Sequence, residues 1–94
     1  MIVLSPDAVA DVERVRTFLE QVNPETARRA MAAILTAIER LQEFPELGMR
    51  TADADIRQIV VRFGASGYIV RYTVIAATKD ILVTRIWHGR EART

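Results

Sequence analysis

The sequence has 94 residues, half of them apolar, with a formal net charge of +1 and a mean hydropathy of +0.09. This length suits a single domain over residues 1–94, and the apolar content argues against intrinsic disorder. Cysteine is absent and histidine occurs once, which excludes a disulfide framework, a thiolate nucleophile and Cys-ligated zinc. We therefore expect no metal and no cofactor.

Nothing in the sequence indicates a membrane segment. Its apolar runs are a few residues long, far short of the ~20 that span a bilayer. The first residues have no basic region and too little apolar length for a signal peptide. We expect a cytoplasmic protein without a membrane partner.

The net charge is near zero, but the two halves of the chain carry charges of opposite sign. Residues 1–49 carry a net charge of −3, whereas residues 50–94 carry +4. All basic residues except Lys79 are arginines, which bind carboxylates and phosphates through a planar, bidentate fork. An acidic partner is therefore expected to dock on the second half.

Two helices are predicted after a short N-terminal strand at residues 2–4. Ser5 and Asn23 are each followed by a proline and an acidic residue, the pattern of an N-cap and first turn. Apolar residues then recur at spacings of four and three, as on one face of a helix. The first stripe is Ala8, Val12, Val15, Leu19 and Val22, widened by Phe18; the second is Ala27, Met31, Ile34, Ile38 and Leu41, widened by Ala30 and Leu35.

The two predicted helices form an antiparallel hairpin, because only about two residues separate them. The second helix should end by Phe44, since the residue before Pro45 is disfavoured in the α conformation. Residues 45–55 show no clear period and are predicted to form a loop.

The remaining chain has the period of two that is typical of strands. We predict strands over residues 56–62, 68–76 and 81–88, with turns at residues 64–67 and 77–80. The order β-α-α-β-β-β predicts an α+β fold, in which an N-terminal strand and a helical hairpin pack on one face of a small antiparallel sheet.

The turn at residues 77–80 predicts that Arg71 pairs with Ile86 and that Ile69 pairs with His88. One sheet face, packed on the helices, would then hold Tyr68, Val70, Tyr72, Val74, Val83, Arg85 and Trp87. The other face would be open and would hold Ile69, Arg71, Thr73, Ile75, Leu82, Thr84, Ile86, His88 and Arg90. An open face this apolar indicates a partner, although a slip of one residue would invert the assignment.

Several side chains have both a structural and a functional interpretation. His88 is the one side chain suited to proton transfer near neutral pH, or else a hydrogen-bonding group at a strand end. Arg71 is either an anion clamp or a solvating residue. On the helix-packed face, Arg85 should pair with a helix carboxylate such as Glu13, Glu20 or Glu39, and Trp87 should belong to the core.

Three segments together resemble the RelE/ParE superfamily of bacterial type II toxin–antitoxin modules. They are Phe44-Pro45-x-x-Gly48, Gly67-Tyr68-Ile69-Val70-Arg71-Tyr72 and Thr84-Arg85-Ile86-Trp87-His88-Gly89-Arg90-Glu91. Their order and spacing cover nearly the whole chain. The ParE-like branch is the better match, through the longer helical hairpin and the strand ending His-Gly-Arg-Glu.

The resemblance to the ParE-like branch implies a toxin that poisons DNA gyrase, without catalysing a reaction of its own. It also implies a ParD-like antitoxin with an acidic amphipathic tail, in a toxin–antitoxin hetero-oligomer. We expect the antitoxin on the open face, at Ile69, Arg71, Ile75, Leu82 and Ile86. The expected target-binding residues are His88, Arg90 and Arg93.

The alternative branch consists of RelE-like endoribonucleases that cut messenger RNA on the ribosome. In that case Arg71 and Arg90 would hold phosphate and His88 would act as acid/base. The match to this branch is incomplete, because Ile69 stands where these enzymes have an arginine after Gly-Tyr. The residues after Arg90 also include no tyrosine.

Overall fold

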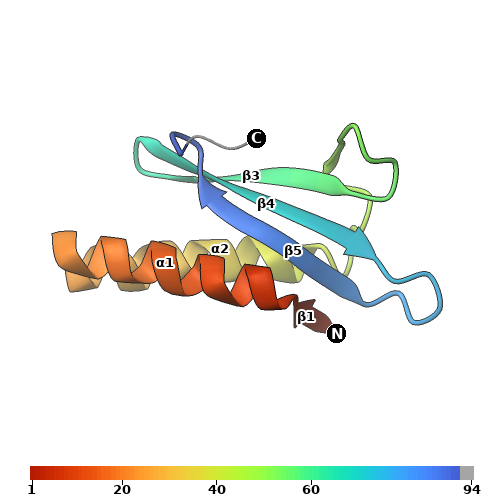
Figure 1. The fold of residues 1–94 in the computed structure, drawn as a ribbon, viewed down its shortest axis with the longest axis horizontal. Helices are drawn as coiled ribbons and strands as arrows, with labels where there is room; N and C mark the ends of the chain where they lie inside the picture. Colours follow the sequence, from red (N-terminus) through yellow and green to blue (C-terminus); the bar gives the residue numbers. More distant parts are fainter. Residues whose placement is uncertain (92–94) are drawn as a thin grey trace.

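The computed structural model describes residues 1–91 and has the expected α+β architecture. Two helices lie side by side on one side of a five-stranded sheet (Figure 1). The elements in chain order are β1 (Ile2–Leu4), α1 (Pro6–Val22), α2 (Pro24–Arg40), β2 (Met49–Arg50), β3 (Arg57–Phe63), β4 (Ser66–Val74) and β5 (Ile81–His88).

Both helices begin at the residues that the capping pattern predicts. The Ser5 side chain accepts a hydrogen bond from the backbone N–H of Ala8, and Pro6 occupies the first turn of α1. Asn23 caps α2 in the same way, accepting from the N–H groups of Glu25 and Thr26. Because Asn23 also ends α1, one residue makes the turn of the helical hairpin.

The predicted helix stripes form the core, with three corrections at their margins. Buried members include Ala8, Val15, Leu19, Ala27, Ala30, Ile34, Ile38 and Leu41, which pack against Val61, Tyr68, Val70 and Tyr72 of the sheet. Phe18, Val22 and Leu35 are more than half exposed, so their assignment to the stripes is wrong. Phe18 precedes the buried Leu19 by one residue, and Leu35 follows the buried Ile34 by one residue. One residue corresponds to about 100° around the helix axis, so both side chains point away from the core.

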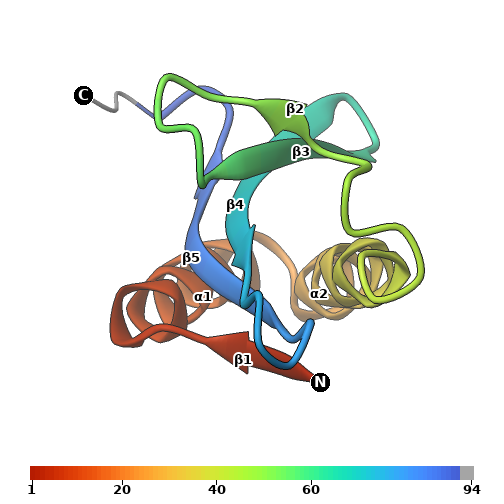
Figure 2. The same ribbon diagram turned by 90° about the vertical axis from the view of Figure 1, so that its right-hand side faces the viewer.

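The sheet is mixed, whereas a purely antiparallel sheet was expected. Its strand order is β1-β5-β4-β3-β2, and β1 runs parallel to β5 while the other pairs are antiparallel. Figure 2 shows β1 at the edge next to β5. The predicted loop at residues 45–55 contains the two-residue strand β2, which pairs with Arg57 and Gln58 of β3.

The register of β4 and β5 also differs from the prediction. Tyr68 pairs with His88 and Arg71 pairs with Arg85, but Tyr72 pairs with Val83, so Thr84 is an extra residue at a β-bulge. A bulge reverses the alternation of side chains along the strand beyond it. Ile86 therefore lies in the core, 1% exposed, while Arg85 and Trp87 face the opposite side.

Candidate functional site

The side of the sheet that faces away from the helices carries an exposed mixed surface, which we call the open face. The ladder places Gln58, Val60, Arg62, Ile69, Arg71, Thr73, Leu82, Arg85 and Trp87 on it. The chain between β2 and β3 also lies on this side (Figure 1). The open face therefore combines apolar side chains with three guanidinium groups, those of Arg62, Arg71 and Arg85.

The expected antitoxin-binding residues fall on the open face with one exception. Ile69, Arg71 and Leu82 lie there, and Ile75 continues the same alternation beyond β4. Ile86 is wrong as an exposed residue, because the bulge at Thr84 turns its side chain into the core. Trp87 takes its place on the open face, paired with Ile69.

Trp87 is only 7% exposed although it lies on the open face. The guanidinium carbon of Arg71 lies 4.9 Å from the centroid of its ring, a cation–π contact. The Arg71 Nε donates a hydrogen bond of 3.2 Å to the Gln58 side chain on β3. Arg71 is thus held in place between neighbouring strands.

The partner of Arg85 is Asp11 of α1, and none of the three expected glutamates. Arg85 donates from Nε to Asp11 Oδ2 at 2.8 Å and from Nη2 to Asp11 Oδ1 at 3.2 Å. The contact exists because β1 ends at Leu4, so that α1 lies against the edge of β5 beyond it. Asp11 there accepts a 2.8 Å hydrogen bond from the Ile86 N–H.

Asp11 is 2% exposed, and its carboxylate accepts four hydrogen bonds from three residues. Burial by itself would raise the pKa of Asp11. Hydrogen bonds from Arg85, the Ile86 N–H and Arg14 outweigh this effect and lower the pKa to about 2. The carboxylate therefore stays charged and ties α1 to β5.

The sequence contains a signal for Asp11 that the prediction of glutamate partners overlooks. Asp11 stands among the buried positions of α1, three residues after Ala8 and four before Val15. A carboxylate at a core position requires a buried partner. This spacing could have identified Asp11 as the partner of an arginine in the sheet.

A second candidate surface lies at the opposite side of β5, at the end of the strand. A cleft of about 560 Å³ is lined by Arg14, Val15, Phe18, Tyr68, His88, Arg90 and Glu91. Phe18 is 63% exposed beside it, and Arg90 is exposed at its rim. The cleft thus has apolar walls and a charged rim.

The chain that forms this rim is fixed at three points. The Gly89 N–H donates to the Gly67 carbonyl oxygen at 2.7 Å. The Glu91 carboxylate accepts from Arg14 of α1 at 3.0 Å. His88 stacks edge-on against Tyr68, and its Nδ1 accepts from the Arg90 N–H at 3.0 Å.

Two of the three predicted target-binding residues therefore lie together. His88 and Arg90 line the same cleft, whereas Arg93 lies outside the described residues. Arg71, which the ribonuclease alternative requires beside them, lies on the open face. His88 pairs with the buried Tyr68 and shares its side of the sheet.

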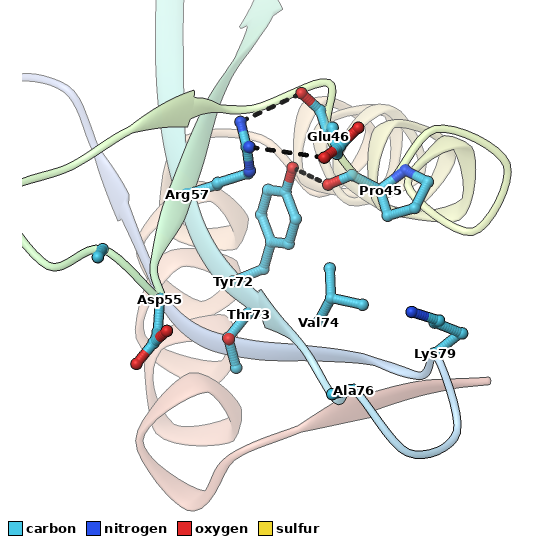
Figure 3. A pocket seen from close by; sticks show the side chains of 10 residues that line it. Pro45, Glu46, Asp55, Arg57, Tyr72, Thr73, Val74, Ala76 and Lys79 are labelled. Carbon is cyan, nitrogen blue, oxygen red and sulfur yellow. Dashed lines mark hydrogen bonds and ion pairs between the residues drawn. The ribbon is translucent and has the colours of Figure 1, made fainter.

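A second pocket, of about 430 Å³, lies where the segment after α2 meets the sheet. Figure 3 shows the Tyr72 hydroxyl pointing at Pro45, to whose carbonyl oxygen it donates at 2.7 Å, and Arg57 reaching the same segment. Arg57 donates to the Gly48 carbonyl oxygen at 2.8 Å. These hydrogen bonds join β3 and β4 to the segment after α2.

Within residues 1–91, no cluster of three or more histidine, aspartate or glutamate side chains could hold a metal ion. In the same part of the chain, neither helix is long and apolar enough to cross a membrane.

Comparison with known proteins places the chain among bacterial toxins. A family model described as ParE toxin of the type II toxin–antitoxin system, parDE, matches residues 2–93. Toxin RelE1 of Caulobacter vibrioides is 34% identical over 92 residues, 98% of this chain and 96% of that protein. Toxin RelE3 of the same organism is 34% identical over 90 residues, 96% and 95% of the two chains.

Two solved structures share the fold. A chain of the chromosomal ParDE toxin–antitoxin system from P. aeruginosa superposes with a TM-score of 0.73 at 19% identity, covering 93% of this chain and 92% of that one. A chain of the intact E. coli RelBE toxin–antitoxin complex gives 0.56 at 16% identity, with coverages of 99% and 98%. With the family model spanning nearly its whole length, this chain belongs to the ParE toxin family of type II toxin–antitoxin systems.

Proposed function

We propose that this toxin inhibits DNA gyrase and is neutralised by a cognate ParD-like antitoxin in a toxin–antitoxin hetero-oligomer. Its family supports an antitoxin partner. The observation that favours gyrase over RNA cleavage is the separation of Arg71 from His88 on opposite sides of the sheet. General acid/base catalysis requires the proton-transfer group and the charge-stabilising groups to reach the same phosphodiester. This separation argues against a ribonuclease site built from Arg71, His88 and Arg90.

The open face suits the antitoxin. Ile69, Ile75 and Leu82 offer apolar contact, while Arg71 and Arg85 offer positive charge for an acidic segment. A stable complex of this kind buries roughly 1,500 Å² or more in total. An amphipathic acidic segment of the antitoxin would match both properties of the face.

The cleft beside His88 suits the target. Phe18 is an exposed aromatic residue and Arg90 an exposed arginine, and these residue types dominate the binding energy of protein interfaces. Because the cleft and the open face lie on different sides of the sheet, target and antitoxin would contact different residues of the toxin. The bound antitoxin would then neutralise the toxin by blocking the approach of the target sterically, or by changing the conformation of the cleft.

The second candidate function is ribosome-dependent cleavage of messenger RNA. It is favoured by the names of the curated relatives, which are RelE toxins, and by the placement of His88 and Arg90 in one cleft. In this reading His88 would transfer the proton and Arg90 would bind phosphate, without Arg71.

The two functions are separated by giving the purified toxin its two candidate targets. We expect it to block supercoiling of relaxed plasmid by bacterial gyrase and to leave translated messenger RNA intact on ribosomes. The cognate antitoxin should restore supercoiling when added in equimolar amount. Cleaved messenger RNA with unaffected gyrase would establish the ribonuclease reading instead.

A further inference from the structure

Arg71 and Arg85 face each other directly across β4 and β5 on the open face. Like charges at directly opposite positions of an antiparallel pair destabilise a sheet. Asp11 neutralises Arg85 from the helix side of the strand edge, through Nε and Nη2. Arg71 has only the neutral Gln58 side chain and the Trp87 ring as partners among residues 1–91. A net positive charge therefore remains between the two arginines.

The hydrogen bonds within residues 1–91 leave several donors of this pair unused. Arg71 uses Nε alone, so both of its Nη atoms remain available. Arg85 uses Nε and Nη2, so Nη1 remains available. A carboxylate accepts about four hydrogen bonds and pairs well with guanidinium forks. The unused donors match such a ligand.

These two arginines share a hollow of about 300 Å³ with residues of the segment between β2 and β3. Its lining is Thr51, Ala52, Asp53, Ile56, Arg71, Thr84 and Arg85. Asp53 is the one acidic side chain of this lining, and its Oδ1 accepts the N–H of Asp55 in its own loop. Within the described residues it makes no ion pair with either arginine, so it does not occupy their unused donors.

We propose that the Arg71–Arg85 pair is a clamp for a carboxylate side chain of an acidic peptide segment. This proposal rests on the proposed antitoxin partnership and specifies which residues recognise the acidic segment. The neighbours of the clamp favour a peptide over RNA. Ile69 and Leu82 flank it with apolar surface, which suits the apolar side chains of an amphipathic segment.

The clamp also explains why a sheet retains two opposed arginines. In the free toxin, repulsion between Arg71 and Arg85 destabilises the sheet, and a bound carboxylate would offset it. The Arg71 charge therefore favours peptide binding but lowers the stability of the free protein. Removing the Arg71 charge should therefore weaken peptide binding without weakening the fold. A merely structural arginine would show the reverse.

The test uses Trp87, which is the single tryptophan of the chain and lies under Arg71. A ten-residue peptide of alternating glutamate and leucine is titrated into the toxin at fixed ionic strength. Binding is followed by Trp87 fluorescence and by calorimetry. We expect saturable binding, at least about tenfold tighter than for the same peptide with glutamine in place of glutamate, as the loss of a charge-assisted pair predicts.

Three variants locate the interaction. Arg71→Gln should weaken glutamate-peptide binding about tenfold or more, and Arg71→Lys should restore part of it, since lysine keeps the charge but lacks the fork. Arg62→Gln removes the same charge from an exposed position of the open face, opposite Gly67 and outside the hollow, and should change binding about twofold at most. The urea midpoint of the free Arg71→Gln protein should be equal to or above that of the wild type.

Three results would overturn the clamp. One is equal binding of the glutamate and glutamine peptides, and another is a lowered urea midpoint in Arg71→Gln with unchanged peptide binding. The third is tighter, Arg71-dependent binding of a twelve-nucleotide single-stranded RNA, which would assign the arginines to phosphate.

The cognate antitoxin separates failure of the clamp from failure of the proposed function. If the antitoxin binds wild-type and Arg71→Gln toxin equally, the clamp is wrong and the partnership stands. If it binds neither protein, the partnership is wrong, and with it the clamp.

Discussion

The backbone N–H of Gly48 donates a hydrogen bond to the hydroxyl of Tyr72, 2.8 Å away, although 24 residues separate the two in sequence. The same hydroxyl donates to the Pro45 carbonyl oxygen. Tyr72 lies in the core with no exposed surface, and burial raises the pKa of its hydroxyl. One buried side chain thus connects the centre of the sheet to the segment that follows α2 and explains the spacing between Pro45 and Gly48.

Replacing Gly48 by alanine should destabilise the protein by about 1–3 kcal/mol, as overpacking typically does. An added Cβ would lie 2.6 Å from the Tyr72 hydroxyl and 3.0 Å from the Gln58 carbonyl oxygen, so the hydrogen bond could not survive unchanged. Urea denaturation measures the loss. Gly67→Ala is the control, because its Cβ would meet only a Val60 methyl at 3.3 Å. Similar losses in both variants would show that the Tyr72 contact is unimportant.

The core of the helical hairpin can be tested at Ile38, which is 3% exposed. Ile38→Ala should cost about 2–5 kcal/mol, through lost burial and the cavity left behind. Leu35 lies three residues earlier on the same helix but is 54% exposed, so Leu35→Ala should cost less than about 1 kcal/mol. Chemical denaturation of the two variants side by side gives the comparison. Equal midpoints would contradict the observed helix phase.

Asp11 should make stability depend on pH in the acid range. Its pKa is about 2 in the folded protein against 3.8 ordinarily, so the unfolded chain binds a proton more readily. The stabilisation is therefore complete above about pH 4 and is lost as pH falls towards 2, amounting to roughly 2 kcal/mol.

The Asp11→Asn variant isolates this contribution. It should be less stable than the wild type near pH 7, and the difference should shrink by roughly 2 kcal/mol between pH 5 and pH 2. Urea titrations at several pH values measure it. A difference that stays constant with pH would mean that the charge of Asp11 is not what stabilises the contact with β5.

The gyrase proposal makes opposite predictions for neighbouring residues of the cleft. His88→Ala should leave most of the growth inhibition intact, because no proton transfer is involved. The double variant Arg90→Ala and Arg93→Ala should lose it, since arginine anchors carry much of an interface's binding energy. Growth after induced expression is the measurement, with unchanged urea midpoints as the control for folding. Toxicity abolished in folded His88→Ala protein would support proton-transfer chemistry, with the ~10²–10⁴-fold effect expected of an acid/base.

Much of the fold could be predicted because its determinants are local. Ser5-Pro6 and Asn23-Pro24 position the helix starts through caps and first-turn prolines, and both helices begin there. The stripe containing Ile34 and Ile38 identifies the buried side of α2, because a helix has one fixed period. The excess of arginine in the second half of the chain likewise favours an acidic partner, because net charge follows from composition alone.

The composition of the open face depended instead on tertiary structure. The alternation of β5 was predicted correctly as far as Val83, but the bulge at Thr84 reverses it, which exchanges Ile86 for Arg85 and Trp87. No local pattern marks this bulge. The bulge occurs where β1 ends. Beyond that point Asp11 of α1 lies at the edge of β5 and accepts hydrogen bonds from the Ile86 N–H and the Arg85 side chain. The sequence alone determined both helices and every strand except β2, whereas the contact between a helix and a strand 74 residues apart decided which arginines lie together on the open face.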